Sequence, residues 1–296
     1  MSFVIMLSTT LKKERDTMQF TKQQFQLLMK QYNPDADWLE IYQSAEKGEK
    51  DALYIVAETL HANEKMEDYI QLLRQLSNEG EAKAHYLLGN CYIEGVGVEE
   101  SFEKALHHYE QAAKAGHADA MNNLADMYFN GEGTDVNLQA AYTWFTKAAE
   151  HDVPEAMFTL GIMHEQGLYV EEDLEKALHW YTESANSGYV EAYYYLGMIY
   201  LEGTHLQETD IPKAMAYFEK AEDEMHVDAI FNLGYIYENG LQGAIDGRRA
   251  VHYYKKAAFM GDDQARERLA EIYEQGYIVQ RDLQQAKKWR TSYIID

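Results

Sequence analysis

Apolar residues return along most of the chain at spacings of three and four, with small residues at fixed places between them. In one copy Ala84, Leu88 and Tyr92 lie four residues apart, which places them on one face of an α-helix. A second segment carries Ala105 and Tyr109 at the same spacing. The pattern therefore predicts pairs of amphipathic helices rather than strands, in which apolar positions would alternate.

The helix pair recurs at an almost constant interval. A glycine three residues after the first-helix tyrosine position returns every 36 or 37 residues, at Gly95, Gly131, Gly167, Gly203, Gly240 and Gly276. Such a glycine is typical of a left-handed helix end. A period of this length is typical of a solenoid, in which each unit buries its apolar face against its neighbours. We therefore predict an all-α solenoid of stacked helix pairs.

The two ends of the chain depart from this repeat. The apolar run at the start of the chain has no basic residue before it, so it is a poor secretory signal. We interpret residues 1–20 as a disordered leader, with a true start at Met18 as an alternative. Residues 21–80 are interpreted as degenerate N-terminal helical repeats. Residues 81–296 are expected to form six full repeats that end in a capping helix over 282–292. Divergent terminal units are expected where one face meets water.

Composition narrows the possible partners and the compartment. The net charge of −24 disfavours nucleic acid and anionic membrane surfaces, and no stretch approaches the ~20 apolar residues of a membrane helix. The single cysteine, Cys91, rules out an intramolecular disulfide framework and favours a reducing, cytoplasmic location. The acidic residues are spread along the chain, so their charge serves either solubility or the attraction of a basic partner.

The sequence offers no set of residues that would form a catalytic centre. His107, His179 and His252 share one slot in alternate repeats, on the order of 20 Å apart. Ligands of one zinc ion must converge to about 2 Å, so these three cannot share it. Cys91 falls on a packing helix and is expected to be a buried, inert thiol. We predict no enzyme activity, no metal and no cofactor.

The repeat pattern matches a known family. Ala-x-x-x-Leu-Gly-x-x-Tyr-x-x-Gly-x-Gly, followed by Lys-Ala-x-x-x-Tyr-x-x-Ala-Ala-x-x-Gly, resembles the Sel-one-like repeat (SLR), a relative of the tetratricopeptide repeat. Departures are local: His164 replaces the tyrosine, Tyr169 and His205 replace the second loop glycine, and Asp152 and Met225 replace the terminal glycine. These departures are expected to affect loop shapes and not the architecture.

The resemblance implies a right-handed α–α superhelix whose first helices line a concave surface. It also implies an adaptor or scaffold role, because family members mostly hold other proteins together. Some secreted relatives are linked to β-lactam binding or hydrolysis, but they depend on a disulfide in each unit. This chain cannot form those disulfides, so the activity is not transferred to it.

First-helix residues off the packing face are the candidate contacts of the concave surface. Two positions before each repeat's leucine stand Tyr86, Asn122, Phe158, Tyr194 and Phe231. Two positions after it stand Asn90, Asp126, Ile162, Met198 and Tyr235. Three further on stand Ile93, Phe129, Glu165, Leu201 and Glu238, of which Phe129 and Glu165 are included as candidates. The first set predicts an aromatic ladder along the surface.

The candidate aromatics have a second interpretation, as core between repeats. The polar members Asn90, Asn122, Asp126 and Glu165 are harder to place in a core, because buried polar groups need partners. We therefore expect a non-enzymatic interaction module that captures a protein or peptide, with a basic partner possible in view of the acidic surface. The alternatives are an acidic inhibitor or immunity-type protein that binds a basic partner, and, less favoured, a hydrolase of the β-lactam type.

Overall fold

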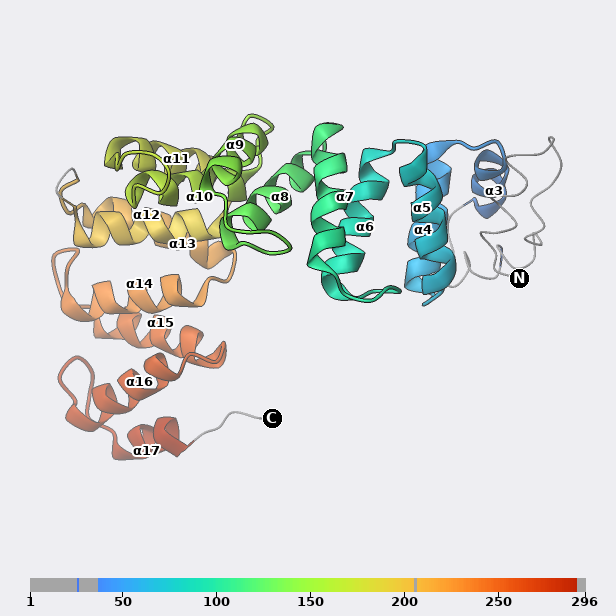
Figure 1. The fold of residues 1–296 in the computed structure, drawn as a ribbon. Coiled ribbons are helices and arrows are strands. Elements are labelled where there is room, and N and C mark those ends of the chain that lie inside the picture. The colour runs from blue at the N-terminus through green and yellow to red at the C-terminus, as the bar shows by residue number, and fades with distance from the viewer. Residues whose placement is uncertain (1–25, 27–36, 205–206, 292–296) are drawn as a thin grey trace. The chain divides into compact units, whose positions relative to one another are not determined.

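The computed structural model describes residues 26, 37–204 and 207–291 (Figure 1). The predicted leader at 1–20, His205, and the start of the predicted degenerate repeats over 21–36, residue 26 excepted, lie outside the described residues. In the described part every regular element is a helix, and each helix contacts its successor within a pair. The predicted all-α solenoid of helix pairs is confirmed.

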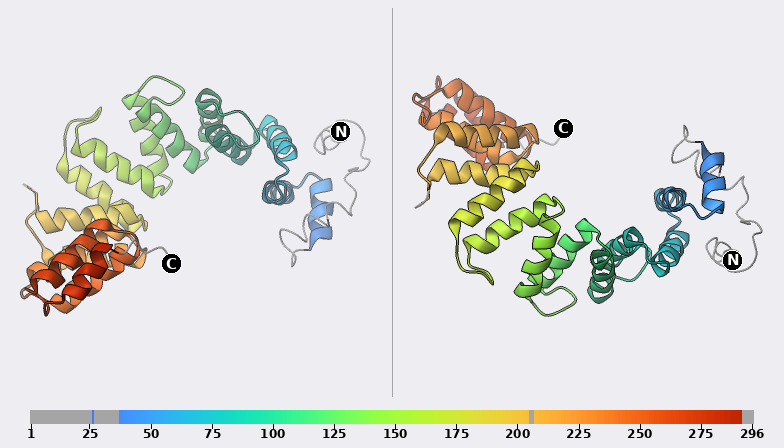
Figure 2. Two further views of the ribbon diagram at one scale, coloured as in Figure 1. Left: turned by 90° about the horizontal axis from the view of Figure 1, so that it is seen from below. Right: turned by 90° about the horizontal axis from the view of Figure 1, so that it is seen from above.

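The chain divides into two compact units, Met1–His151 and Asp152–Asp296. The first unit contains α3 (Trp38–Glu46), α4 (Lys50–Ala62), α5 (Met66–Asn78), α6 (Ala82–Glu94), α7 (Phe102–Lys114), α8 (Ala118–Asn130) and α9 (Leu138–Ala149). The second contains α10 (Pro154–Glu165), α11 (Leu174–Asn186), α12 (Val190–Glu202), α13 (Ile211–Asp223), α14 (Val227–Asn239), α15 (Gly247–Phe259), α16 (Asp263–Gln275) and α17 (Leu283–Thr291). In each unit the pairs follow one another in chain order (Figure 2).

Helix boundaries follow from capping residues at fixed places in the repeat. Second helices start after a short polar side chain that accepts a hydrogen bond from a backbone N–H in the first turn, which satisfies an otherwise unpaired donor. This residue is Ser101, Asn137, Asp173, Asp210, Asp246 or Asp282. Four first helices end in a left-handed glycine, namely Gly95, Gly131, Gly240 and Gly276. Pro154 and Pro212 stand in the first turn of a helix, where the missing N–H of proline leaves no hydrogen bond unmade.

In four repeats an aromatic ring of the second helix lies against a glycine of the first helix. A Cβ atom added at Gly89 would lie 2.4 Å from the Tyr109 ring, and one at Gly161 would lie 2.5 Å from the Tyr181 ring. Gly197 with Phe218 and Gly234 with Tyr254 repeat the contact. The contact is between the backbone of the first helix and the ring of the second, and it leaves the ring almost completely buried.

Three described loop positions that carry another residue in place of glycine keep a positive φ. Tyr169 has φ +69°, against +68° at Gly97 and Gly133. Asp152 and Met225 have φ +60° and +64°, smaller than the +91°, +88° and +98° at the equivalent Gly116, Gly188 and Gly261. Their side chains accept a left-handed backbone that costs an L-residue roughly 1–2 kcal/mol.

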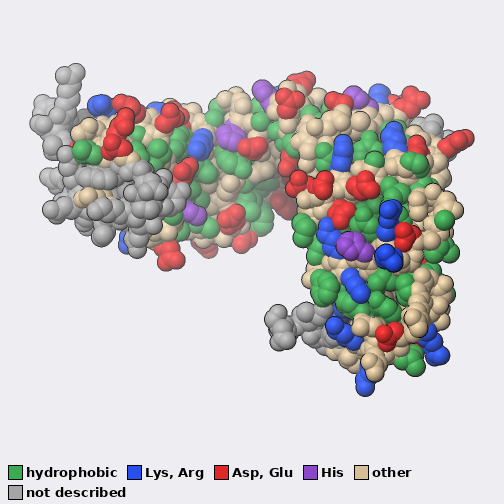
Figure 3. All heavy atoms as spheres, turned by 180° about the vertical axis from the view of Figure 1, so that it is seen from behind, with side chains coloured by type: hydrophobic (Ala, Val, Ile, Leu, Met, Phe, Trp, Pro, Cys, Tyr) green, Lys and Arg blue, Asp and Glu red, His purple; other side chains and the backbone are tan. Residues whose placement is uncertain are grey.

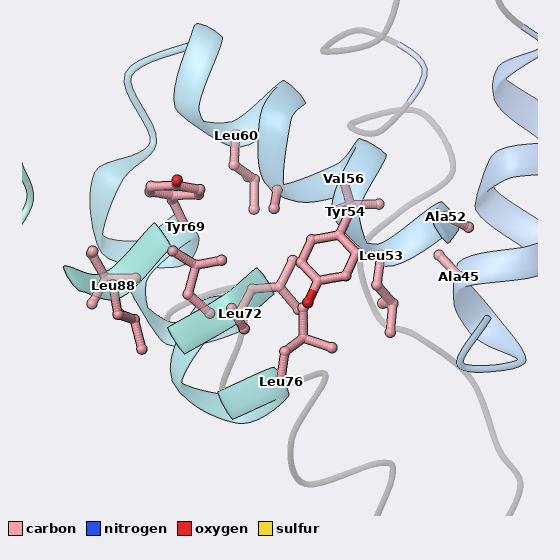
Figure 4. Packing of buried hydrophobic residues seen from close by; sticks show 14 of the residues in the cluster. Ala45, Ala52, Leu53, Tyr54, Val56, Leu60, Tyr69, Leu72, Leu76 and Leu88 are labelled. Atoms are coloured by element: carbon pink, nitrogen blue, oxygen red, sulfur yellow. The ribbon is translucent and has the colours of Figure 1, made fainter. Parts of the chain in front are cut away.

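The N-terminal pair α4–α5 is shorter than the pairs that follow. Three residues, Asn63–Lys65, join its helices, whereas seven, Gly95–Ser101, join α6 and α7. Its core still matches the repeat: Leu60 of α4, Tyr69 of α5 and Leu88 of α6 pack together (Figure 4). The pair is thus a repeat with a shortened loop.

Met225 provides a test of the stored backbone strain, because its side chain is 56% exposed and contributes little packing. We expect Met225→Gly to raise the free energy of unfolding by about 0.5–1 kcal/mol. Glycine removes the penalty of the left-handed backbone, but part of this gain is lost because glycine is more flexible in the unfolded chain. Urea unfolding followed by circular dichroism measures the change. Met225→Ala is the control and should bring no gain; an equal gain in both variants would show that strain is not the cause.

Candidate partner-binding surface

First helices of neighbouring repeats lie next to one another within each unit and are joined by side-chain contacts. In the second unit α12 contacts α14 directly. The Tyr195 hydroxyl of α12 donates to Glu165 of α10 over 2.7 Å, and Arg268 of α16 pairs with Glu238 of α14. The candidate residues therefore lie on faces built from first helices, as the repeat register predicts.

Two of the candidate aromatic rings stack on a histidine that starts the next repeat. The centroids of the Tyr86 and His117 rings are 4.4 Å apart, and those of Tyr194 and His226 are 4.5 Å apart. Both histidines also cap a first helix, because each ring accepts the N–H of the residue three positions on. Sequence reasoning missed this role, although both histidines stand at the same place in the repeat.

The other candidate rings also pack against neighbouring helices. Phe158 lies 5.3 Å from the Tyr181 ring and 5.7 Å from the Tyr195 ring, centroid to centroid. Phe231 lies 5.1 Å from the Tyr254 ring. All of these candidate rings are half-buried. These rings pack against neighbouring helices on one side and are accessible on the other. They therefore form neither a fully exposed aromatic ladder nor a closed core between repeats.

The polar candidates are engaged by neighbouring side chains. Asn90 accepts the Tyr109 hydroxyl over 2.7 Å, and the Asn122 amide donates to Asp126 over 3.1 Å. Glu165 accepts two hydroxyls, from Tyr181 at 2.9 Å and from Tyr195 at 2.7 Å. These groups are held in fixed positions at the surface, which lowers the entropy lost when they bind a partner.

The apolar candidates differ in exposure. Phe129 packs on Phe145 with centroids 6.3 Å apart, and Ile162 and Met198 are half-buried beside the core of the second unit. Tyr235 is 41% exposed, more than any of the other eleven candidates. It is the candidate side chain that a partner could cover with the least change in the repeat.

A buried carboxylate forms the densest polar cluster of the second unit. Glu238 is 3% exposed and binds the Arg268 guanidinium through both oxygens, at 2.6 and 3.0 Å. It also accepts the hydroxyls of Tyr254, over 2.6 Å, and Tyr277, while Glu271 pairs with Arg268 over 2.7 Å. Burial by itself would raise the pKa of Glu238, but the hydrogen bonds from Arg268 and the two tyrosines hold it below its ordinary value.

In four repeats the ring of the second helix is matched to the fifth residue after the first-helix leucine. Where the ring is a tyrosine, at 181 and 254, that residue is Glu165 or Glu238 and accepts its hydroxyl. Where the ring is a phenylalanine, at 145 and 218, the residue is apolar, Phe129 or Leu201. The repeat of Tyr109 departs from this pairing, because its hydroxyl donates to Asn90. In the other four repeats the pairing was visible in the sequence. It would have predicted the roles of Tyr181 and Tyr254, which were not among the candidates.

The first unit has a hollow of about 400 Å³ between the first helices α4 and α6. Ala57, Tyr69, Leu87 and Cys91 contribute buried and half-buried walls, and the candidate Asn90 also lines it. More exposed side chains that line it are Glu58, His61, Lys83 and Glu94. This volume lies in the ~300–1,000 Å³ range of ligand pockets.

Comparison with known proteins identifies the repeat. The Sel1 repeat family model matches residues 82–117, 118–153, 154–189, 190–224, 227–262 and 263–289, which is more than half of the chain. The chain belongs to the Sel1 repeat family. The resemblance noted from the sequence is thereby confirmed. Sel1 repeat proteins generally mediate protein–protein interactions and are typically not enzymes.

Two solved structures are similar over most of this Sel1 repeat chain. A Sel1 repeat protein from Oxalobacter formigenes has 29% identity and a TM-score of 0.70, covering 79% of this chain and 96% of that one. A protective antigen of uropathogenic Escherichia coli strains that displays an SLR fold has 26% identity and a TM-score of 0.75, covering 98% of this chain and 63% of that one. Among curated proteins no relative matches. The acidic-inhibitor and hydrolase alternatives stay predictions.

The remaining reactive or charged groups of the described residues do not form a further candidate site. Cys91 is 5% exposed, as predicted, and burial raises the pKa of its thiol to about 11. No group of three or more His, Cys, Asp or Glu side chains in the described segments is placed to hold a metal ion. None of the helices described is long and apolar enough to span a membrane. Acidic side chains are scattered over the face in Figure 3 and do not form one block.

Glu238 makes the second unit sensitive to loss of its cation. Arg268→Ala should lower the free energy of unfolding by about 2 kcal/mol, less than the ~3–5 of a fully buried pair because Arg268 is partly exposed. Urea unfolding measures the loss, and a double-mutant cycle with Glu238→Gln isolates the pair. The control is Arg290→Ala, which breaks an exposed pair with Glu274 and should cost at most about 1 kcal/mol. Equal losses would contradict the special role of Glu238.

The histidine pair between α6 and α7 predicts a pH dependence in the first unit. The Nδ1 atoms of His85 and His108 lie 3.0 Å apart. Burial, and next the charge of His85, lower the pKa of His108 to about 4. Between this value and the ordinary 6.5 the unfolded chain binds more protons, so stability should fall with pH below about 6.5. We expect a loss on the order of 1–2 kcal/mol between pH 7 and pH 5, allowing for partial exposure.

Urea unfolding at a series of pH values tests this dependence. His108→Phe should flatten the slope, while His179→Ala, at an exposed position in the second unit, should leave it unchanged. An unchanged slope in His108→Phe would assign the effect to other groups.

Proposed function

We propose that this Sel1 repeat protein is a non-enzymatic interaction module that holds a partner protein or peptide against its first helices. The observation that carries the proposal is the recurrence of half-buried aromatic or polar side chains two positions before the leucine in five first helices, beside buried second-helix rings. A core needs the second-helix rings; it does not require polar groups such as Asn122 and Asp126, which bond to each other at the accessible slots. The interaction role of the family supports the same assignment.

The mechanism would be capture by a surface that is already ordered. Tyr86, Tyr194 and Phe158 are packed on one side before a partner arrives, so covering the other side buries aromatic area at a low cost in side-chain entropy. Glu165 and Asn90 keep acceptor groups in place through tyrosine hydroxyls. Such acceptors suit the backbone N–H groups or cations of a partner segment.

The charge of the chain favours a basic partner. With a net charge of −24, the surface attracts cationic segments at long range and speeds their association at low salt. Partner specificity would come from the first-helix slots, because scattered charge by itself selects poorly.

Affinity capture with the immobilised chain tests the proposal. The two side chains changed are Tyr235, the most exposed candidate, and Met198, a half-buried candidate at the edge of the core. Tyr235→Ala combined with Met198→Ala should reduce the amount of captured partner at least fivefold, since interface hot spots cost more than about 1 kcal/mol each. Quantitative mass spectrometry measures the captured proteins, and circular dichroism confirms folding. The matched control is Phe259→Ala, which removes a 66% exposed ring at the end of a second helix.

Two outcomes would contradict the proposal. One is capture that is unchanged in the Tyr235→Ala and Met198→Ala variant. The other is a loss of equal size in Phe259→Ala, which would show that exposed aromatic area in general, and not the first-helix face, holds the partner.

A further inference from the structure

The hollow of the first unit stands at the register position that Arg268 fills in the second unit. Counted from the leucine slot of each repeat, His61, Leu87 and Val96 around the hollow correspond to Glu238, Arg268 and Tyr277. Those three side chains of the second unit meet in one hydrogen-bonded cluster.

The first-unit residues at these positions cannot form the same cluster. Leu87 and Val96 have no donor or acceptor, and His61 stands where the buried carboxylate would be. Among the described residues, no side chain therefore fills the space between α4 and α6, which has a floor of Ala57 and Cys91 and the buried ring of Tyr69. In the second unit the guanidinium of Arg268 occupies the corresponding slot.

The electrostatic surroundings of the hollow favour a cation. Glu58 and Glu94 both line it, and both carboxylates act on the Tyr69 hydroxyl strongly enough to help raise its pKa, after burial and Cys91. One cation is nearby: Lys83 Nζ lies 3.7 Å from Glu58 and 4.7 Å from the centroid of the Tyr54 ring. That pair is about half exposed on both sides and is therefore weak and easily exchanged.

We propose that this hollow receives an arginine side chain of the bound partner, with Glu58 and Glu94 as its carboxylates and the Tyr69 ring as its wall. The assignment rests on the proposed function and specifies the chemistry of one contact. Arginine is chosen over lysine because its planar guanidinium can bind two carboxylates and lie against an aromatic ring at the same time. The chain's own Arg268 makes the carboxylate contacts in the second unit.

The test uses the full chain with ¹³C-labelled methyl groups and N-acetyl-arginine amide as the probe. Leu60, Leu87 and Val96 place methyl groups in or beside the hollow. Their NMR signals should shift with a dissociation constant of about 1 mM, as for a single side chain without its peptide. N-acetyl-citrulline amide, which has the same shape without the charge, should shift them at least tenfold less.

Three variants are expected to change probe binding in different ways. Glu58→Gln with Glu94→Gln should weaken probe binding about tenfold, because it removes both charge-assisted acceptors. Lys83→Met should strengthen binding, since it removes the competing cation. His61→Glu with Leu87→Arg copies the second-unit cluster into the hollow and should abolish the shift of Val96. The control, Glu171→Gln with Glu172→Gln, removes the same charge from an exposed loop of the second unit and should change nothing.

The proposal is overturned by equal responses to the arginine and citrulline probes, or by an equal response to N-acetyl-lysine amide, which would show a site without preference for guanidinium. Methyl shifts that depend on protein concentration and not on the probe would assign the hollow to a second copy of the chain. If the probe moves no signal while the Tyr235→Ala and Met198→Ala variant still loses its captured partner, the arginine slot is wrong and the proposed function stands.

Discussion

The contact between one aromatic ring and one residue without a side chain is the constraint from which the rest of the repeat follows. A mid-helix glycine costs about 1 kcal/mol relative to alanine, and the chain accepts this at Gly89, Gly161, Gly197 and Gly234. What it gains is a ring of Tyr109, Tyr181, Phe218 or Tyr254 buried against the first helix. The ring fixes the distance and rotation of the helix pair. It also decides which first-helix positions remain at the surface.

The identity of that ring then determines the polar chemistry beside it. A buried phenol must find an acceptor, because an unmade hydrogen bond costs about 1–3 kcal/mol. In the second unit Glu165 and Glu238 are those acceptors, and each recruits a further donor from the next first helix, Tyr195 or Arg268. These two polar links between first helices of the second unit are thus a consequence of a tyrosine in place of a phenylalanine, and they reach the face on which we place partner binding.

The sequence predicted the parts of this structure that depend on spacing. Leucine, alanine and glycine at fixed intervals predict the helix pairs, their order and the first-helix positions, because periodicity maps directly onto a helix face. Spacing did not predict the loop conformation at Tyr169 and Met225. There the neighbouring helices fix the backbone and the side chain accepts the strain.

The candidate site was less predictable, for a physical reason. A side chain's position in the repeat shows which face it lies on, but its exposure depends on what the next repeat places against it. The repeat positions of Tyr86 and Tyr194 predict exposed rings, but the capping histidines His117 and His226 stack on them. Asn90 and Glu165 looked unpartnered because their tyrosine donors come from another helix.

The irregular N-terminal pair shows how such a solenoid can acquire a specific site. Between α14 and α16 the side chains of Arg268 and Tyr277 fill the space between two adjacent first helices. A solenoid tolerates the loss of such filling in one repeat, because stability is approximately a sum over neighbouring units and no single core has to be complete. Leu87 and Val96 keep the helices of the first unit packed but leave the slot between them open. The departure from the repeat is therefore where a partner can supply what the chain leaves out, while the regular repeats hold the frame in place.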